Sequence, residues 1–88
     1  MNNDEFEKFR ELLDQTYQWP DYYEFKFIVK TLDKDNVISN LEGFSLTETP
    51  SKKGTYIAIS ARKLMKSSQE VLDVYQVIGT IKGIMFNL

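Results

Sequence analysis

The chain has 88 residues, of which 42% are hydrophobic and 14% aromatic, so it is long enough for one domain with a packed core and too apolar for a disordered protein. It contains no cysteine and no histidine, which excludes disulfides, a thiol nucleophile, an ordinary zinc site and the side chain that most readily transfers protons near neutral pH. The net charge of −2 conceals an asymmetry: residues 1–21 carry six acidic and two basic side chains, whereas residues 52–88 carry six basic and two acidic ones.

Residues 4–17 are predicted to form an amphipathic, acidic helix, because four apolar side chains recur at helical spacing. These side chains are Phe6, Phe9, Leu12 and Leu13. Their stripe needs a surface to cover, which is either the chain's own sheet or another molecule. Pro20 ends the helix, and Trp19 is expected to fill the junction with the following strand. The chain thus divides into this N-terminal helix, residues 1–18, and a single domain, residues 19–88.

The rest of the chain predicts the order strand, helix, strand, strand, helix, strand. The expected elements are a strand over residues 22–29, a short helix that Asp33 caps, strands over residues 44–49 and 56–64, a helix opened by a Ser67–Glu70 capping box, and a strand over residues 81–88. Gly54 suits the turn between two strands, and Gly83 permits a bulge or a close approach. This order predicts an α+β, ferredoxin-like βαββαβ domain: a four-stranded antiparallel sheet with two helices on one face, plus the extra N-terminal helix.

The hairpin sequence Pro50-Ser51-Lys52-Lys53-Gly54-Thr55-Tyr56, the alternating strand after it, the helix with Tyr75 and Gly79, and the terminal strand resemble the YbeD-like family of small bacterial proteins. The Trp19-Pro20 pair is similar to that family's aromatic-proline entry into its first strand. The resemblance covers about residues 19–88 and implies a ferredoxin-like fold close to the ACT domains that regulate metabolic enzymes. The first helix of the domain is shorter than in the family, and the acidic leader is longer. The family implies no catalytic residue.

The candidate ligand-binding residues are Ser51, Lys52, Lys53, Gly54, Tyr56 and Arg62. Two lysines beside a glycine turn suggest an anion-binding loop, and the alternative is a solvated hairpin end. The charge asymmetry likewise fits either two solvated faces or a site for an acidic partner on the basic half. Tyr56 and Arg62 could share the open face of the sheet with Lys26, as in RNA-binding sheets, but the usual aromatic signature is absent and the chain is acidic overall.

We therefore expect a cytoplasmic, non-enzymatic regulatory or protein-interaction module similar to ACT domains, with no cofactor or metal. Its partner would be a protein or a small metabolite, and free sheet edges would allow a homodimer. The alternative is small-anion or metabolite binding at the Lys52–Gly54 hairpin, and a second alternative is RNA binding on the open sheet face. No membrane partner is expected, because no apolar stretch approaches the ~20 residues that cross a bilayer.

Overall fold

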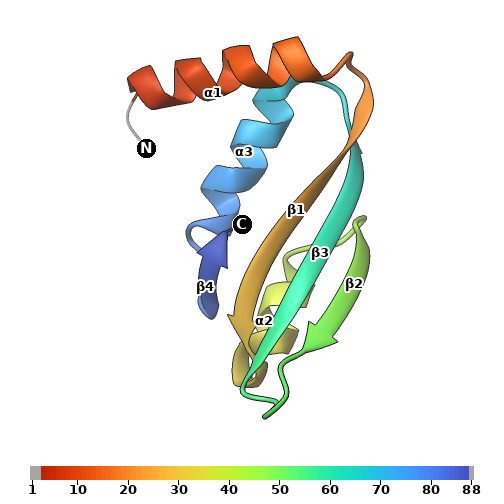
Figure 1. The fold of residues 1–88 in the computed structure, drawn as a ribbon, viewed down its shortest axis with the longest axis vertical. Coiled ribbons are helices and arrows are strands. Elements are labelled where there is room, and N and C mark those ends of the chain that lie inside the picture. The colour runs from red at the N-terminus through yellow and green to blue at the C-terminus, as the bar shows by residue number, and fades with distance from the viewer. Residues whose placement is uncertain (1–2, 88) are drawn as a thin grey trace.

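The computed structural model describes residues 3–87, which form three helices and a four-stranded antiparallel sheet (Figure 1). The helices are α1 (Asn3–Thr16), α2 (Lys34–Ser39) and α3 (Ser68–Ile78), and a short 3₁₀ helix, η1 (Thr31–Asp33), precedes α2. The strands are β1 (Asp21–Lys30), β2 (Ser45–Pro50), β3 (Tyr56–Met65) and β4 (Ile84–Asn87), in the order β2-β3-β1-β4. The α+β class and the four-stranded antiparallel sheet predicted from the sequence are confirmed.

The core lies on one face of the two central strands, where alternate side chains of β1 and β3 meet. Phe25, Phe27 and Val29 are buried on β1. Their partners across the ladder are the buried residues Ala61, Ile59 and Ile57 of β3. Helices α2 and α3 complete this core with the buried residues Val37, Val71, Leu72 and Ile78. Because side chains alternate between faces along a strand, the intervening residues form the opposite, open face of the sheet.

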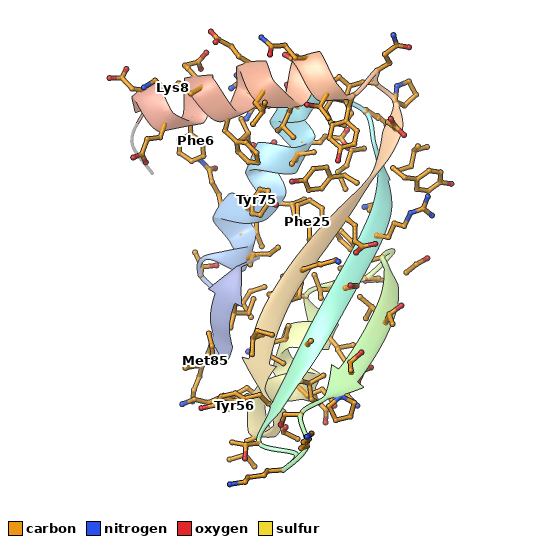
Figure 2. The ribbon with its side chains drawn as sticks, viewed as in Figure 1. Phe6, Lys8, Phe25, Tyr56, Tyr75 and Met85 are labelled. Carbon is orange, nitrogen blue, oxygen red and sulfur yellow. The ribbon has the colours of Figure 1, made fainter. Side chains whose placement is uncertain are left out.

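Helix α1 packs on its own domain, so its apolar stripe covers the chain's own core rather than another molecule. Leu13 is buried in the same core as the strands, and Phe6 and Phe9 pack against that core. The Phe9 ring lies 5.6 Å from the Tyr75 ring of α3, measured between centroids. Figure 2 shows Phe6 turned toward α3 and Lys8 on the outer side of α1. The N-terminal helix is therefore part of the hydrophobic core.

Aromatic side chains join α1, β1 and α3. The Tyr75 ring lies 5.0 Å from the Phe25 ring, and the Tyr75 and Tyr23 hydroxyls are hydrogen-bonded at 2.8 Å (Figure 2). At the junction between α1 and β1, half-buried Trp19 stacks on Tyr17 with centroids 5.2 Å apart. Trp19 thus fills the helix–strand junction, as its place before Pro20 predicts.

Of the two predicted helix caps, the one at α3 is confirmed and the one at α2 is wrong. Ser67 caps α3, since its hydroxyl accepts a hydrogen bond from the Glu70 N–H at 3.3 Å. Asp33 makes no side-chain capping bond at the start of α2. The reason is that η1 runs directly into α2, so this helix has no separate extended residue from which a side chain reaches back to cap it.

The last strand is shorter than predicted, because it begins at Ile84 rather than at Ile81. The N–H groups of Thr80 and Ile81 donate to the carbonyls of Val77 and Ile78, at 3.0 and 3.1 Å. These bonds extend the end of α3 as a turn and withdraw Thr80 and Ile81 from the sheet. The predicted strand end at residue 88 lies outside the described residues.

None of the helices within residues 3–87 is long and apolar enough to cross a membrane.

Gly83 makes the close approach that the sequence suggested, and we expect Gly83→Ala to destabilise the fold. Its φ is +105°, and an added Cβ would lie 2.3 Å from the Asp33 Cβ. Strain and overlap together should cost about 2 kcal/mol or more of the free energy of unfolding. Denaturant unfolding measures this loss.

Gly54→Ala is the matched control for that substitution. Gly54 also has a positive φ, +75°, but nothing lies within 4 Å of an added Cβ. Only the left-handed backbone should then cost stability, about 1 kcal/mol. Equal losses for the two alanine variants would contradict the close packing of Gly83 on Asp33.

Tyr75 should make the fold sensitive to alkali. Burial, and then the hydrogen bond with Tyr23, raises the pKa of Tyr75 well above its ordinary value of 10.0. Above about pH 10 the unfolded chain therefore loses this proton while the folded chain keeps it, so the stability that Tyr75 contributes is full below pH 10 and declines as the pH rises. We expect Tyr75→Phe to lower the free energy of unfolding by about 1 kcal/mol at neutral pH. The variant should also lose less stability than wild type as the pH rises above about 10.

Denaturant unfolding of both proteins, between about pH 9 and pH 11, tests this expectation. The difference in unfolding free energy between wild type and Tyr75→Phe should narrow as the pH rises. Parallel pH profiles would show that the Tyr75 hydroxyl does not titrate differently in the folded and unfolded chains.

Candidate functional site

The loop that joins β2 to β3 is shaped by its own residues. Gly54 adopts a φ of +75°, which residues with a Cβ rarely adopt. The Gly54 N–H donates to the Ser51 carbonyl at 3.0 Å, and the Ser51 hydroxyl accepts from the Tyr56 N–H at 3.2 Å. The turn signals read from the sequence therefore correspond to a defined hairpin loop.

Two hydrogen bonds hold this loop against the end of β1. Lys30, the last residue of β1, pairs with Tyr56, the first residue of β3. The residues that follow β1 therefore lie beside the hairpin loop. The Thr31 N–H donates to the Thr55 carbonyl at 3.0 Å, and the Thr31 hydroxyl donates to the Gly54 carbonyl. Residues 30–32 and residues 51–56 thus form one surface, which we call the hairpin-end site. It lies at the end of the sheet far from α1, where Figure 2 labels Tyr56.

The hairpin-end site contains two adjoining hollows, of about 310 and 290 Å³. Both are lined by Lys53, Thr55 and Tyr56. The larger is also lined by Lys30, Thr31, Leu32 and Gly54, and the smaller by Ser51 and Lys52. The two hollows therefore present one continuous contact area rather than two separate sites.

Five of the six candidate residues lie in this area, and Arg62 does not. Arg62 shares a face of β3 with Tyr56 but is six residues further along the strand, about 20 Å away at the usual rise per residue. Its guanidinium lies 4.1 Å from the centroid of the Tyr22 ring at the other end of the sheet. Alternation along the strand predicts the correct face for Arg62 but not its distance from the loop.

Positive charge gathers at the hairpin-end site without compensation. Lys30, Lys52 and Lys53 are exposed, and none forms an ion pair with an acidic group in residues 3–87. Nearby Lys34 differs, because its Nζ lies 2.7 Å from the Glu48 carboxylate, whose hydrogen bond and charge raise the Lys34 pKa. The three free ammonium groups remain available to an anionic partner.

Apolar surface accompanies these lysines. The Leu32 side chain is 97% exposed and Tyr56 is 40% exposed, and both line the larger hollow. A single exposed leucine is ordinary on a protein surface, but an apolar pair at the edge of a cationic hollow is a feature of contact sites. Sequence reasoning missed Leu32, although pairing the end of the first strand with the start of the third would have brought it to the hairpin.

Tyr22 and Tyr56, two aromatic residues on the open sheet face, are far apart. The β1–β3 register sets Tyr22 opposite Leu64 and Tyr56 opposite Lys30, which separates the two tyrosines by eight residues of paired strand, or roughly 25 Å. Neighbouring bases of RNA stack on rings that lie side by side. Tyr22 and Tyr56 cannot provide such a pair.

A further hollow of about 170 Å³ lies between α2 and α3, and it is mostly apolar. Phe44, Val77 and Ile81 line it, and Val77 is 53% exposed. Among the described residues, no group of three or more aspartates and glutamates is placed to hold a metal ion. Within the described residues, the hairpin-end site combines uncompensated positive charge, exposed apolar surface and the larger of these hollows.

Comparisons of the chain with protein-family models, with curated proteins and with solved structures found no match.

Proposed function

We propose that the chain is a non-enzymatic regulatory or protein-interaction module that contacts its partner through the hairpin-end site. One observation carries this proposal: the almost fully exposed Leu32 lies beside lysines that form no ion pair within residues 3–87. Burying Leu32 against a partner contributes affinity, and the lysines favour acidic partners over basic ones. The larger hollow is lined by cations, hydroxyls and apolar groups, and this mixture supports binding of a partner.

The finer description of the fold belongs to the same proposal. We infer a ferredoxin-like, ACT-like domain, supported by a strand order in which β3 lies between β1 and β2 and pairs antiparallel with both. The YbeD-like resemblance includes Pro50–Tyr56, which contains the hairpin loop, together with the Trp19-Pro20 pair, the alternating strand after the hairpin, the helix with Tyr75 and Gly79, and the terminal strand. A cytoplasmic location is also part of the proposal, because the cysteine-free composition suits a reducing compartment.

Small-anion or metabolite binding is a second candidate for the same surface. The larger hollow, at about 310 Å³, reaches the size of small-molecule sites, and it combines Lys30 and Lys53 with the apolar Leu32. Such a ligand would carry a carboxylate or phosphate next to an apolar group. The two candidates differ in size of ligand rather than in the residues used.

Replacing the exposed apolar and cationic side chains together should weaken partner capture. In a pull-down from native extract, we expect the bait Leu32→Gln/Lys53→Gln to retain at least about tenfold less of the partner than wild type, because a buried leucine and a charge contact together contribute 1.4 kcal/mol or more. Quantitative mass spectrometry of the captured proteins measures the ratio.

Val77→Gln is the matched control bait, because Val77 is also an exposed aliphatic side chain but lies in the other hollow. It should capture the same proteins as wild type. If Leu32→Gln/Lys53→Gln captures the wild-type set undiminished, the hairpin-end site is not the contact surface.

Titration with inorganic phosphate and with a short fatty acid carboxylate distinguishes the second candidate. If the site binds an apolar anion, amide NMR signals of residues 30–32 and 51–56 should shift with the carboxylate, and the shifts should weaken with added salt because exposed lysines are screened. Phosphate alone should produce smaller shifts. Unmoved signals with both probes would reject small-anion binding and leave the protein partner.

A further inference from the structure

The two ends of the molecule carry opposite charge, and each carries an exposed leucine. Helix α1 lies at one end of the longest axis, which measures 39 Å, and the hairpin-end site lies at the other (Figure 1). We propose that α1 of one copy of the chain binds the hairpin-end site of a second copy, in a head-to-tail contact. This inference rests on the proposed function, because it names the partner of that surface.

The outer side of α1 has the chemistry that the hairpin-end site requires. Leu12 is 58% exposed, whereas its neighbour Leu13 is buried in the core. Asp4 and Glu11 are exposed and form no ion pair within residues 3–87. Helical geometry places them about 80° and about 100° around the helix from Leu12, on the side away from the core, whereas basic Lys8 lies one turn before Leu12 (Figure 2). The surface therefore presents an apolar side chain with a surplus of negative charge.

The hairpin-end site mirrors this arrangement with the opposite sign. Leu32 is exposed among Lys30, Lys52 and Lys53. Contact between the two surfaces would bury both leucines and bring free carboxylates to free ammonium groups, which favours the encounter as well as the bound state. A single copy cannot make this contact with itself, since its two surfaces lie at opposite ends.

Charge also disfavours a two-fold contact centred on either surface. If a two-fold axis passed through one of them, the three lysines would face three lysines, or acidic α1 would face acidic α1. Like charges brought together in this way oppose association. The head-to-tail contact brings opposite charges together and leaves one free surface at each end, so assembly should grow with concentration and weaken with salt.

Two complementary variants test the contact. The hairpin variant, Leu32→Gln/Lys53→Glu, keeps α1, and the helix variant, Glu11→Lys/Leu12→Gln, keeps the hairpin-end site. All four side chains are exposed, so each variant should fold, as circular dichroism and thermal unfolding will verify. In analytical ultracentrifugation at low salt, wild type should show a mass that rises with concentration, while each variant alone should associate at least about tenfold more weakly.

An equimolar mixture of the two variants provides the decisive result. Each variant retains the surface that the other lacks, so the mixture should form a one-to-one dimer and nothing larger. Val77→Gln should associate as wild type does. Three results would overturn the proposal: wild type that remains monomeric at millimolar concentration and low salt, a mixture that remains monomeric, or single variants that associate as well as wild type.

The outcome also separates this inference from the proposed function. If wild type is monomeric but the Leu32→Gln/Lys53→Gln bait still loses a captured protein, the head-to-tail contact is rejected and the hairpin-end site binds an acidic segment of a different protein. If wild type is monomeric and that bait captures the wild-type set, both proposals are rejected.

Discussion

The ten-residue antiparallel pairing of β1 with β3 determines both the core and the candidate site. The register that buries Phe25 opposite Ala61 also sets Lys30 opposite Tyr56. A shift of one residue would turn the buried side chains outward, since successive side chains point to opposite faces. The core therefore fixes the register, and the register brings the end of β1 to the hairpin. The hairpin-end site is in this sense a consequence of how the interior packs.

Features that depend on a single segment of the chain could be predicted from the sequence. The alternation of strands, the Ser67 cap and the hairpin loop follow from neighbouring residues, and the structure has them where predicted. Features that depend on two distant segments were not readable. Arg62 shares the open sheet face with Tyr56, as alternation predicts, but it lies beside Tyr22 at the other end of the sheet. Alternation along a strand predicts the face of a side chain and not its distance from a candidate partner. Leu32 was missed because its importance arises only when β1 meets the hairpin.

The two wrong local predictions have a similar origin. Asp33 has a residue type that suits a helix cap, but its side chain packs against Gly83, which is fifty residues later in the sequence. Ile81 has the residue type of a strand, but its N–H donates a hydrogen bond to the carbonyl of Ile78. In both cases a hydrogen bond or a packing contact outweighed a preference that amounts to about 1 kcal/mol.

Helix α1 has two roles that lie on opposite sides of it. Its inner side supplies Leu13 to the core, and Phe9 contacts Tyr75 of α3. Its outer side holds the acidic residues and Leu12. Deleting the helix would remove both sides at once, and the loss of Leu13 alone should destabilise the domain, because truncating a buried leucine typically costs about 2–5 kcal/mol. A deletion would therefore lose binding through unfolding as well as through the missing surface. Substitutions confined to the outer side leave the core intact, so a change in association can then be assigned to contact between molecules.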